Sequence, residues 1–131
     1  MVDFHGWELP VQYEGILAEH RHCRTAAALF DTSHMGQFRV RGPRAADTLA
    51  CACTQNAVKM SVGRCRYGFL LTEAGGILDD TILARLGDDD FLLVVNADPR
   101  QSDLAWLTEH FGDAAEVEDQ TPMWGLSLIH I

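Results

Sequence analysis

Hydrophobic residues recur at helical spacing in the first quarter of the chain and alternate with polar residues further on. The positions that share one helical face predict a helix from about Gln12 to Leu29; they are Ile16, His20, Cys23 and Ala27. We expect the stretch that follows, from Phe30 to Arg41, to be extended. Its later part, Gln37 to Arg41, alternates polar and apolar residues in the way typical of a half-buried strand.

The middle of the chain predicts a short helix and then a series of tight hairpins. Gly42-Pro43 opens the helix, which should end near Ala52, because proline is tolerated in the first helical turn. Paired glycines within Glu73-Ala74-Gly75-Gly76 favour a hairpin turn, since they permit a positive φ. The expected strands are Arg64 to Thr72, Ile77 to Leu86 and Phe91 to Asn96, with a second turn at Gly87-Asp88-Asp89-Asp90.

The last third predicts a helix and a final strand. Asp98 is expected to cap this helix, with Pro99 in its first turn. Its buried side should carry Leu104, Leu107 and Phe111, and residues 114–117 should form one more strand. Because tight hairpins imply antiparallel pairing and long crossovers are missing, we expect an α+β fold, with an antiparallel sheet and flanking helices.

Composition and charge narrow the classes of function. Hydrophobic residues make up 47% of the 131 residues, and no apolar run approaches the roughly 20 residues that span a bilayer. The net charge of −9 argues against a nucleic-acid partner, which needs a positive surface. The opening residues lack the basic and apolar regions of a signal peptide. We expect a solvated surface for the scattered arginines, which are Arg21, Arg24, Arg39, Arg41, Arg44, Arg64 and Arg66.

The cysteines favour no metal site. None of the four is spaced as a CxxC pair, so we predict reduced thiols and no bound metal. Cys51 and Cys53 are expected to be small buried residues at a helix end. His20 and Cys23 share a helical face, but two ligands without a third make a weak site.

Two adjacent acids inside an apolar strand are the first candidate for chemistry. Neighbours in a strand point to opposite faces, so one of Asp79 and Asp80 should point inward and the other toward water. An inward carboxylate needs a donor or a cation, and serves either as a hydrogen-bond hub or as a site residue. The residues alone leave open which role applies, and whether the pKa of the inward acid is raised or lowered.

Two further segments concentrate polar residues. Phe30-Asp31-Thr32-Ser33-His34-Met35-Gly36 places His34 near Asp31 and Ser33. A hydrolase triad is disfavoured because the Gly-x-Ser-x-Gly motif is missing, and a turn held by Asp and Ser side chains is the favoured interpretation. The opening residues 3–10 carry two aromatic residues and a proline, as in an arm that packs on a domain.

These segments together resemble the T-protein family, the aminomethyltransferases of the glycine cleavage system. Residues 1–10 are similar to the family's entry motif, and residues 29–36 are similar to its Phe-Asp-Val-Ser-His-Met segment, with Thr32 in place of Val. Gly75-Gly76-Ile77-Leu78-Asp79-Asp80 matches its hairpin, and Val94-Val95-Asn96-Ala97 matches a strand end. The similarity runs in register from Met1 to about Trp124.

The resemblance implies a reaction and its participants. T-proteins take the aminomethyl group carried by the lipoyl arm of H-protein, release ammonia and deliver the methylene carbon to tetrahydrofolate. It implies tetrahydrofolate as the one-carbon acceptor, lipoylated H-protein as the partner, and no nucleic acid or membrane. The expected location is the bacterial cytoplasm, or the mitochondrial matrix in a eukaryote.

The resemblance also implies the site residues. Asp80 matches the family's catalytic carboxylate, which lies close to folate N10. Met35, Tyr67 and Asn96 match residues that line the folate site together with Asp80. Asp79 and His34 are expected to support them.

The chain departs from the family at both ends. Met1 is similar to an internal methionine, and the family continues well beyond residue 131. Residues 1–125 are expected to be part of a folate-binding N-terminal domain, and residues 126–131 to be an unmatched, exposed and artefactual tail. The alternatives are a related folate-dependent demethylase domain, a non-catalytic folate-binding module or an inert fragment.

Overall fold

The structure is a computed structural model that describes residues 1–130. It divides into two compact units, residues 35–124 and a smaller unit made of residues 1–34 and 125–131. Residues 35–124 hold all but one of the residues for which a site role is predicted. Each unit is described by itself.

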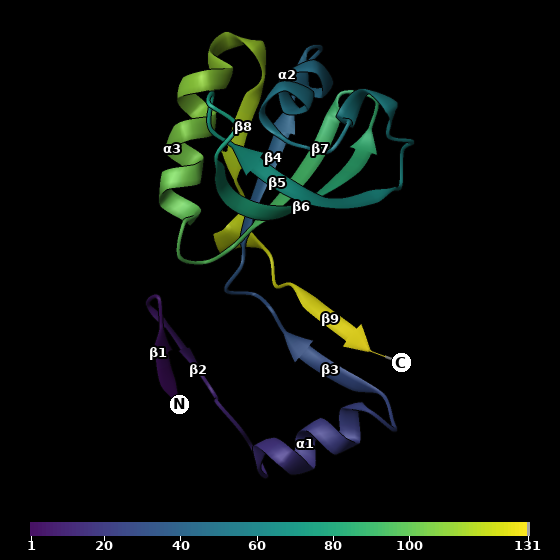
Figure 1. The fold of residues 1–131 in the computed structure, drawn as a ribbon, viewed down its shortest axis with the longest axis vertical. Helices are drawn as coiled ribbons and strands as arrows, with labels where there is room; N and C mark the ends of the chain where they lie inside the picture. Colours follow the sequence, from purple (N-terminus) through teal and green to yellow (C-terminus); the bar gives the residue numbers. More distant parts are fainter. Residues whose placement is uncertain (131) are drawn as a thin grey trace. The chain divides into compact units, whose positions relative to one another are not determined.

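Residues 35–124 form a five-stranded antiparallel sheet in the order β5-β6-β7-β4-β8 (Figure 1). Its strands are β4 (Gly36–Arg41), β5 (Cys65–Leu71), β6 (Ile77–Gly87), β7 (Asp90–Val95) and β8 (Glu116–Asp119). The unit also contains α2 (Ala45–Ala52), α3 (Arg100–Phe111) and the short 3₁₀ turns η1 (Ala57–Lys59), η2 (Gly112–Ala114) and η3 (Thr121–Met123). The predicted α+β fold is confirmed.

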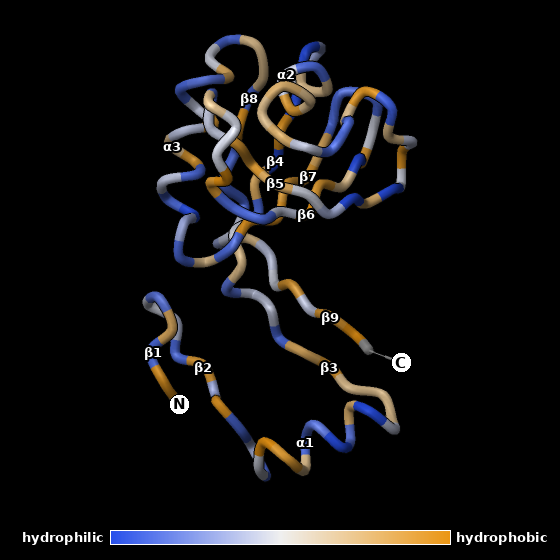
Figure 2. Tube along the Cα trace, viewed as in Figure 1, coloured by the Kyte–Doolittle hydropathy of each residue, from blue (hydrophilic) through white to orange (hydrophobic). Residues whose placement is uncertain are grey.

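Alternation along the strands divides this sheet into two faces. Phe38 and Val40 of β4 are fully buried, whereas the intervening Arg39 is partly exposed. The buried face packs against α2 and α3, which contribute Leu49 and Leu107 to one hydrophobic core. Figure 2 shows the hydrophobic residues concentrated along the strands of the sheet. The opposite face carries the more exposed residues of the alternation, such as Arg39 of β4 and Ile82 of β6.

The smaller unit consists of two strand pairs and one helix. The strands β1 (Val2–Phe4) and β2 (Trp7–Leu9) form a hairpin whose turn places His5 at a φ of 52°. Helix α1 (Ile16–Cys23) follows, and β3 (Ala28–Asp31) then pairs antiparallel with β9 (Ser127–His130). Sequence patterns had indicated neither this hairpin nor the β3–β9 pair.

The helix predicted over Gln12–Leu29 is wrong in length, because α1 has only eight residues. Gly15 precedes it with a φ of 141°, outside the helical region. At the other end, the Thr25 hydroxyl bonds the carbonyls of Arg21 and His22 at 3.0 and 3.3 Å. No residue of α1 is buried, so no core packing extends it in either direction.

Two predicted helix starts are also displaced. Helix α3 begins at Arg100 with Pro99 as its N-cap residue and without a side-chain cap, so Asp98 is not the cap. Helix α2 begins at Ala45, and Pro43 lies just outside it. The predicted strands agree with β5, β6 and β7 to within about two residues, which is the usual uncertainty of boundaries.

The predicted tail, residues 126–131, is described except for Ile131, which lies outside the described residues. Leu128 and Ile129 are 58% and 63% exposed, while the backbone of β9 is paired with β3. The Leu126 carbonyl also accepts bonds from the Thr32 amide and hydroxyl at 2.9 and 3.1 Å. Residues 127–129 are therefore exposed in their side chains and paired through their backbone.

A close contact in the β5–β6 hairpin explains one glycine. Gly68 lies opposite Thr81, and a Cβ there would meet the Thr54 hydroxyl and the Gln55 side chain at 2.5 Å. Gln55 is only 5% exposed and donates to the Thr81 hydroxyl at 3.1 Å and to its carbonyl at 3.3 Å. The glycine therefore lets a buried amide tie the two strands together.

We predict that Gly68→Ala lowers the free energy of unfolding by about 1–3 kcal/mol, because the methyl group displaces Gln55 and strains the core. Denaturant unfolding followed by circular dichroism measures the change. Gly87→Ala is the matched control in the neighbouring β6–β7 pair, since its Cβ would meet only Asp90 Cβ, at 3.4 Å. Equal stability of the two variants would contradict the packing argument.

Candidate functional site

The two aspartates of β6 point to opposite faces of the sheet. Asp79 is 7% exposed and lies among buried polar residues, whereas Asp80 is exposed. The following residues keep the alternation, since Thr81 is buried and Ile82 is 41% exposed. The inward acid is therefore Asp79, and the acid open to solvent is Asp80.

Asn96 connects these two carboxylates. Its backbone N–H donates to Asp79 Oδ2 at 2.8 Å, and its side-chain Nδ2 donates to Asp79 Oδ1 at 2.7 Å. The same Nδ2 donates to Asp80 Oδ1 at 2.9 Å and to the Asp80 carbonyl at 3.2 Å. The amide has two N–H groups, so it can serve one carboxylate with each. Asp79 therefore acts as a hydrogen-bond hub.

The end of β7 explains how one side chain reaches both faces. Ile82 of β6 pairs with Val94 of β7, and continuing this register by two residues sets Asn96 opposite Asp80. Asn96 lies immediately beyond β7 and is not held in the strand pleat. Its side chain can therefore lie along the edge of the sheet and bond residues on both sides.

Tyr67 borders Asp80 on the exposed face. Tyr67 pairs with Ile82 and Phe69 pairs with Asp80, so Tyr67 and Asp80 are diagonal neighbours across β5 and β6. Partial burial raises the pKa of Tyr67, and the charge of Asp80 and a hydrogen bond with it raise the pKa further. The Tyr67 hydroxyl stays protonated at neutral pH and available as a donor.

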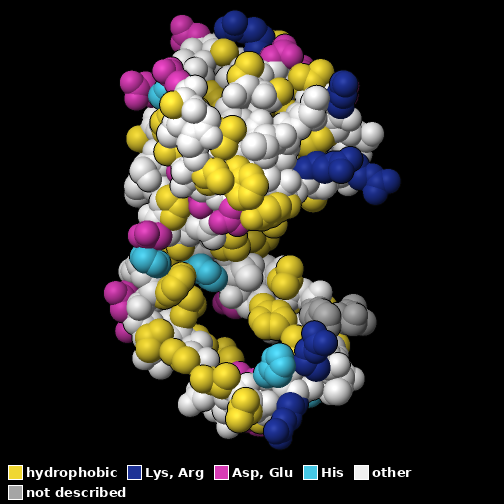
Figure 3. Space-filling model, viewed as in Figure 1, with side chains coloured by type: hydrophobic (Ala, Val, Ile, Leu, Met, Phe, Trp, Pro, Cys, Tyr) yellow, Lys and Arg dark blue, Asp and Glu magenta, His cyan; other side chains and the backbone are white. Residues whose placement is uncertain are grey.

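Apolar side chains surround this exposed carboxylate. Tyr67 contacts Phe69 edge to face, with ring centroids 5.5 Å apart. Ile77 and Ile82 are 64% and 41% exposed. Figure 3 shows hydrophobic side chains at the surface near β5 and β6. An exposed carboxylate with apolar and aromatic neighbours suits a flat ring system that carries a basic or N–H-bearing nitrogen.

Met35 lies at the same end of the sheet as Asn96. Gly36, the residue after Met35, pairs with Val95, the residue before Asn96. A Cβ on Gly36 would meet Val95 Cγ2 at 2.5 Å, so glycine leaves room here for the Val95 side chain of β7. The structure thus joins Asp79, Asp80 and Asn96 by hydrogen bonds, places Tyr67 beside Asp80, and sets Met35 next to Asn96 in the register of the sheet.

His34 belongs to the smaller unit, and its predicted supporting role stays a prediction. Its ring contacts Phe4 edge to face, with centroids 5.4 Å apart. His34 Nδ1 is buried without a hydrogen-bond partner among residues 1–130. Asp31 Oδ1 accepts the backbone N–H of Ser33 at 2.9 Å, so this segment forms the predicted turn held by an Asp side chain.

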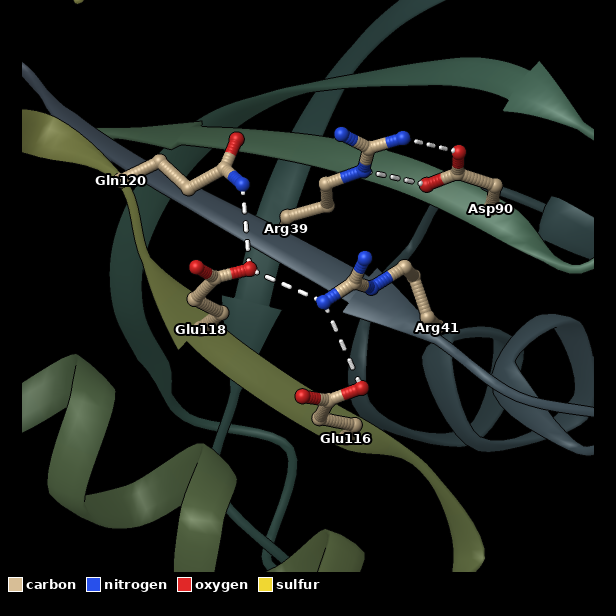
Figure 4. Close-up of polar contacts among 6 residues, drawn as sticks. All are labelled: Arg39, Arg41, Asp90, Glu116, Glu118 and Gln120. Carbon is tan, nitrogen blue, oxygen red and sulfur yellow. Dashed lines mark hydrogen bonds and ion pairs between the residues drawn. The ribbon is translucent and has the colours of Figure 1, made fainter. Parts of the chain in front are cut away.

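Ion pairs between residues of β4, β7 and β8 lie on the same face of the sheet as Asp80 (Figure 4). Arg39 binds Asp90 through two bonds of 2.9 and 2.6 Å, which raise the pKa of Arg39 and lower the pKa of Asp90. Arg41 lies 3.0 Å from Glu118 and 3.4 Å from Glu116. The predicted solvated surface is therefore wrong for these two arginines, which are paired and partly buried. Their cations are committed to local acids.

One buried acid beneath the site was not predicted from the sequence. Asp103 of α3 is 2% exposed. Burial, then the charge of Asp79 and a hydrogen bond with it, raise the pKa of Asp103 to about 7. The signal was present in the sequence, because Asp103 precedes the buried Leu107 by four residues and Phe111 by eight.

The described residues contain neither a cluster of metal-binding side chains nor a helix that could span a membrane. In residues 1–130, no group of three or more His, Cys, Asp or Glu side chains is placed to hold a metal ion. None of the helices within this part of the chain has the length and apolar character needed to cross a bilayer.

Cys51 and Cys53 were both predicted to be buried. Cys53 is buried, and burial raises the pKa of its thiol to about 12. Cys51 is exposed, so the prediction is wrong for Cys51.

Comparison with known proteins identifies the class. Residues 1–129 match the family model described as the GCVT N-terminal domain. The chain belongs to this family. Among curated relatives, an aminomethyltransferase of Bdellovibrio bacteriovorus is 44% identical over 126 residues, covering 95% of the chain and 35% of the relative. An aminomethyltransferase of Chlorobaculum parvum is 46% identical over 129 residues, covering 98% and 35%. The chain thus spans about a third of the length of these relatives.

Solved structures agree on the fold. Glycine cleavage system aminomethyltransferase T from Bartonella henselae superposes with a TM-score of 0.85 at 39% identity, covering 98% of this chain and 36% of that one. Heterotetrameric sarcosine oxidase from Corynebacterium sp. U-96 superposes with a TM-score of 0.52 at 21% identity, covering 79% and 49%. The first is a close relative in sequence and fold, and the second is similar in fold alone.

The raised pKa of Asp103 predicts a pH-dependent stability difference. The folded state holds a proton between about pH 4 and about pH 7 that the unfolded state has released, so stability falls as pH rises through this window. Asp103→Asn removes this effect. Between about pH 5 and about pH 8, we expect the stability of Asp103→Asn to increase relative to that of wild type. The gain in the free energy of unfolding is at most about 4 kcal/mol, and it appears as a higher relative melting temperature.

Thermal unfolding at the two pH values measures this difference. Asp113→Asn removes an exposed carboxyl in η2 and is the matched control. A stability difference between Asp103→Asn and wild type that is the same at both pH values would show that Asp103 titrates normally.

Proposed function

We propose that the protein containing this chain is an aminomethyltransferase of the glycine cleavage system. It transfers the methylene carbon of aminomethyl-lipoyl H-protein to tetrahydrofolate and releases ammonia. Residues 1–125 form part of its folate-binding domain, and the match to the family model extends to residue 129. The family membership and the names of the relatives support the reaction class.

The proposal rests on one observation, which is that two adjacent carboxylates share a hydrogen-bond donor but differ in their exposure to solvent. Asn96 donates to both, but Asp79 is buried and Asp80 is open to solvent. Asn96 and Tyr67 occupy only part of the four lone-pair positions on the Asp80 carboxylate. Asp80 is therefore held in place with acceptor capacity left for a substrate.

The surroundings of Asp80 fit tetrahydrofolate as that substrate. In our proposal the pterin and aminobenzoyl rings lie against the exposed apolar and aromatic side chains, with Tyr67 beside Asp80 and Met35 at the same sheet end. Aromatic and thioether groups suit flat rings. Folate N10 would then lie within hydrogen-bond reach of the Asp80 carboxylate.

Asp80 assists by orientation and charge. When a folate amine attacks the aminomethyl carbon, positive charge develops on that nitrogen, and a fixed carboxylate stabilises it without reorganising. Two carbon–nitrogen bonds form on the folate, while the carbon–sulfur bond to the lipoyl arm and the carbon–nitrogen bond to the leaving ammonia break. The protons lost by N5 and N10 end on the ammonia and the lipoyl thiolate. No oxidant is required.

The remaining participants follow from the same reaction. Lipoylated H-protein is the proposed partner, tetrahydrofolate is the acceptor, and no metal takes part. The bacterial sources of the relatives support a bacterial cytoplasmic enzyme. Asp79 supports Asp80 through Asn96, and His34 is proposed to contribute to the assembled site of the full-length protein.

Asp80→Asn in the full-length protein tests the proposal. The change removes the charge of an exposed side chain, so folding should survive while turnover falls by about 10²-fold or more, the usual effect of losing a reacting acid or base. Ammonia release from aminomethylated H-protein in the presence of tetrahydrofolate is the measurement.

Asp89→Asn is the matched control, because it makes the same chemical change at an exposed position in the β6–β7 turn. It should keep wild-type turnover. If Asp80→Asn also turns over at nearly the wild-type rate, the proposed role of Asp80 is wrong. If wild type binds tetrahydrofolate but releases no ammonia, the chain belongs to a binding protein instead.

A further inference from the structure

A buried carboxyl group lies behind the proposed site and is not used by the reaction described above. Asp103 of α3 is 2% exposed, and its Oδ2 accepts no hydrogen bond from any of residues 1–130. Its neighbour is the Asp79 side chain, which is itself 7% exposed. An acid on the core-facing side of a helix is costly unless it is neutral or paired.

The hydrogen bonds of Asp79 show which of the two acids carries the proton. Asp79 Oδ1 and Oδ2 each accept an N–H of Asn96, at 2.7 and 2.8 Å, so Asp79 acts as the acceptor. Two carboxyl groups can share a hydrogen bond only if one of them is protonated. The shared proton therefore belongs to Asp103.

Among the described residues, the basic side chains of α3 on either side of Asp103 are engaged elsewhere. Asp79 faces it from β6. Arg100, one turn earlier in α3, binds Asp119 of β8 at 2.6 Å and is committed to it. His110, further along α3, stacks on Trp106 and lies 3.7 Å from Glu73. Protonation is thus how this buried pair avoids two adjacent negative charges.

We propose that Asp103 is a positioning residue for Asp80. As a neutral acid, Asp103 donates to Asp79, which holds Asn96, and Asn96 in turn presents the Asp80 carboxylate on the open face of the sheet. The inference rests on the proposed function for its catalytic consequence, but the chain of hydrogen bonds is a property of the fold. Asp103 itself touches no substrate.

The arrangement has a consequence at alkaline pH. When Asp103 loses its proton, it can no longer donate to Asp79, and repulsion between the two carboxylates disturbs the acceptor that holds Asn96. Asp80 then loses its fixed orientation. Turnover of the wild-type enzyme should therefore decline as Asp103 deprotonates, without a change in the residues that meet the substrate.

Two substitutions at Asp103 separate positioning from simple packing. Asp103→Asn keeps the size and a donor toward Asp79 but cannot titrate, so it should keep kcat within about twofold of wild type and flatten the alkaline decline. Asp103→Ala removes the donor, so it should lower kcat by about tenfold or more while the KM for tetrahydrofolate changes little. Both are compared in the full-length protein.

The side-chain amide of Asn96 provides a readout that does not depend on turnover. In protein labelled with ¹⁵N-asparagine, we expect its NH₂ resonances in wild type to shift with pH as Asp103 titrates. This inflection should vanish in Asp103→Asn, and the resonances should lose their protection from exchange in Asp103→Ala. This readout applies even if Asp103→Ala is too unstable for kinetics.

The outcomes distinguish the two proposals. An Asn96 resonance that is insensitive to both substitutions, or an Asp103→Ala enzyme with wild-type kcat, overturns the positioning role even if Asp80→Asn is inactive. An active Asp80→Asn enzyme overturns the proposed function and the catalytic consequence of Asp103. In that case the Asn96 resonances still decide whether Asp103 orients Asn96. Loss of kcat in Asp103→Ala with rescue in Asp103→Asn supports the inference.

Discussion

The side-chain amide of Asn96 is the interaction on which the site depends. Consecutive residues of a strand point to opposite faces, so Asp79 and Asp80 cannot bind the same partner within the sheet. Asn96 reaches both because it lies just past the end of β7, where the pleat no longer directs its side chain. One amide thereby couples a buried acid to an exposed one, and the geometry of the exposed acid is set from inside the domain.

The rest of the sheet keeps this exposed acid free. On the same face, Arg39 and Arg41 are neutralised by acids of β7 and β8, so neither is left to pair with Asp80. Around Asp80 the neighbours are apolar or aromatic, which lowers local polarity and leaves its remaining lone pairs to a ligand. On the opposite face, α2 and α3 bury the core and bring Asp103 beneath Asp79. Core packing and site geometry are thus parts of one arrangement.

Sequence patterns could predict the elements of the sheet but not the connections that form the site. Alternation and paired glycines were sufficient for β5, β6 and β7, because half-buried strands with tight turns leave a local signal. The prediction made helix α1 too long, because apolar residues keep helical spacing beyond Gly15 and Thr25. No residue of α1 is buried, so packing does not extend the helix that far. The opposed pair Asp79 and Asp80 followed from strand geometry. The bridge by Asn96 and the acid at Asp103 depend on register and packing between distant segments, which periodicity does not encode.

The proposed function requires that Asp80, held by Asn96, meets the folate amine. A crystal structure of the full-length protein with tetrahydrofolate tests this most directly. We expect folate N10 within hydrogen-bond distance of the Asp80 carboxylate, the rings against Tyr67, and the bonds from Asn96 to Asp79 and Asp80 intact. Tetrahydrofolate bound elsewhere, or bound here with Asp80 turned away from the amine, would contradict it.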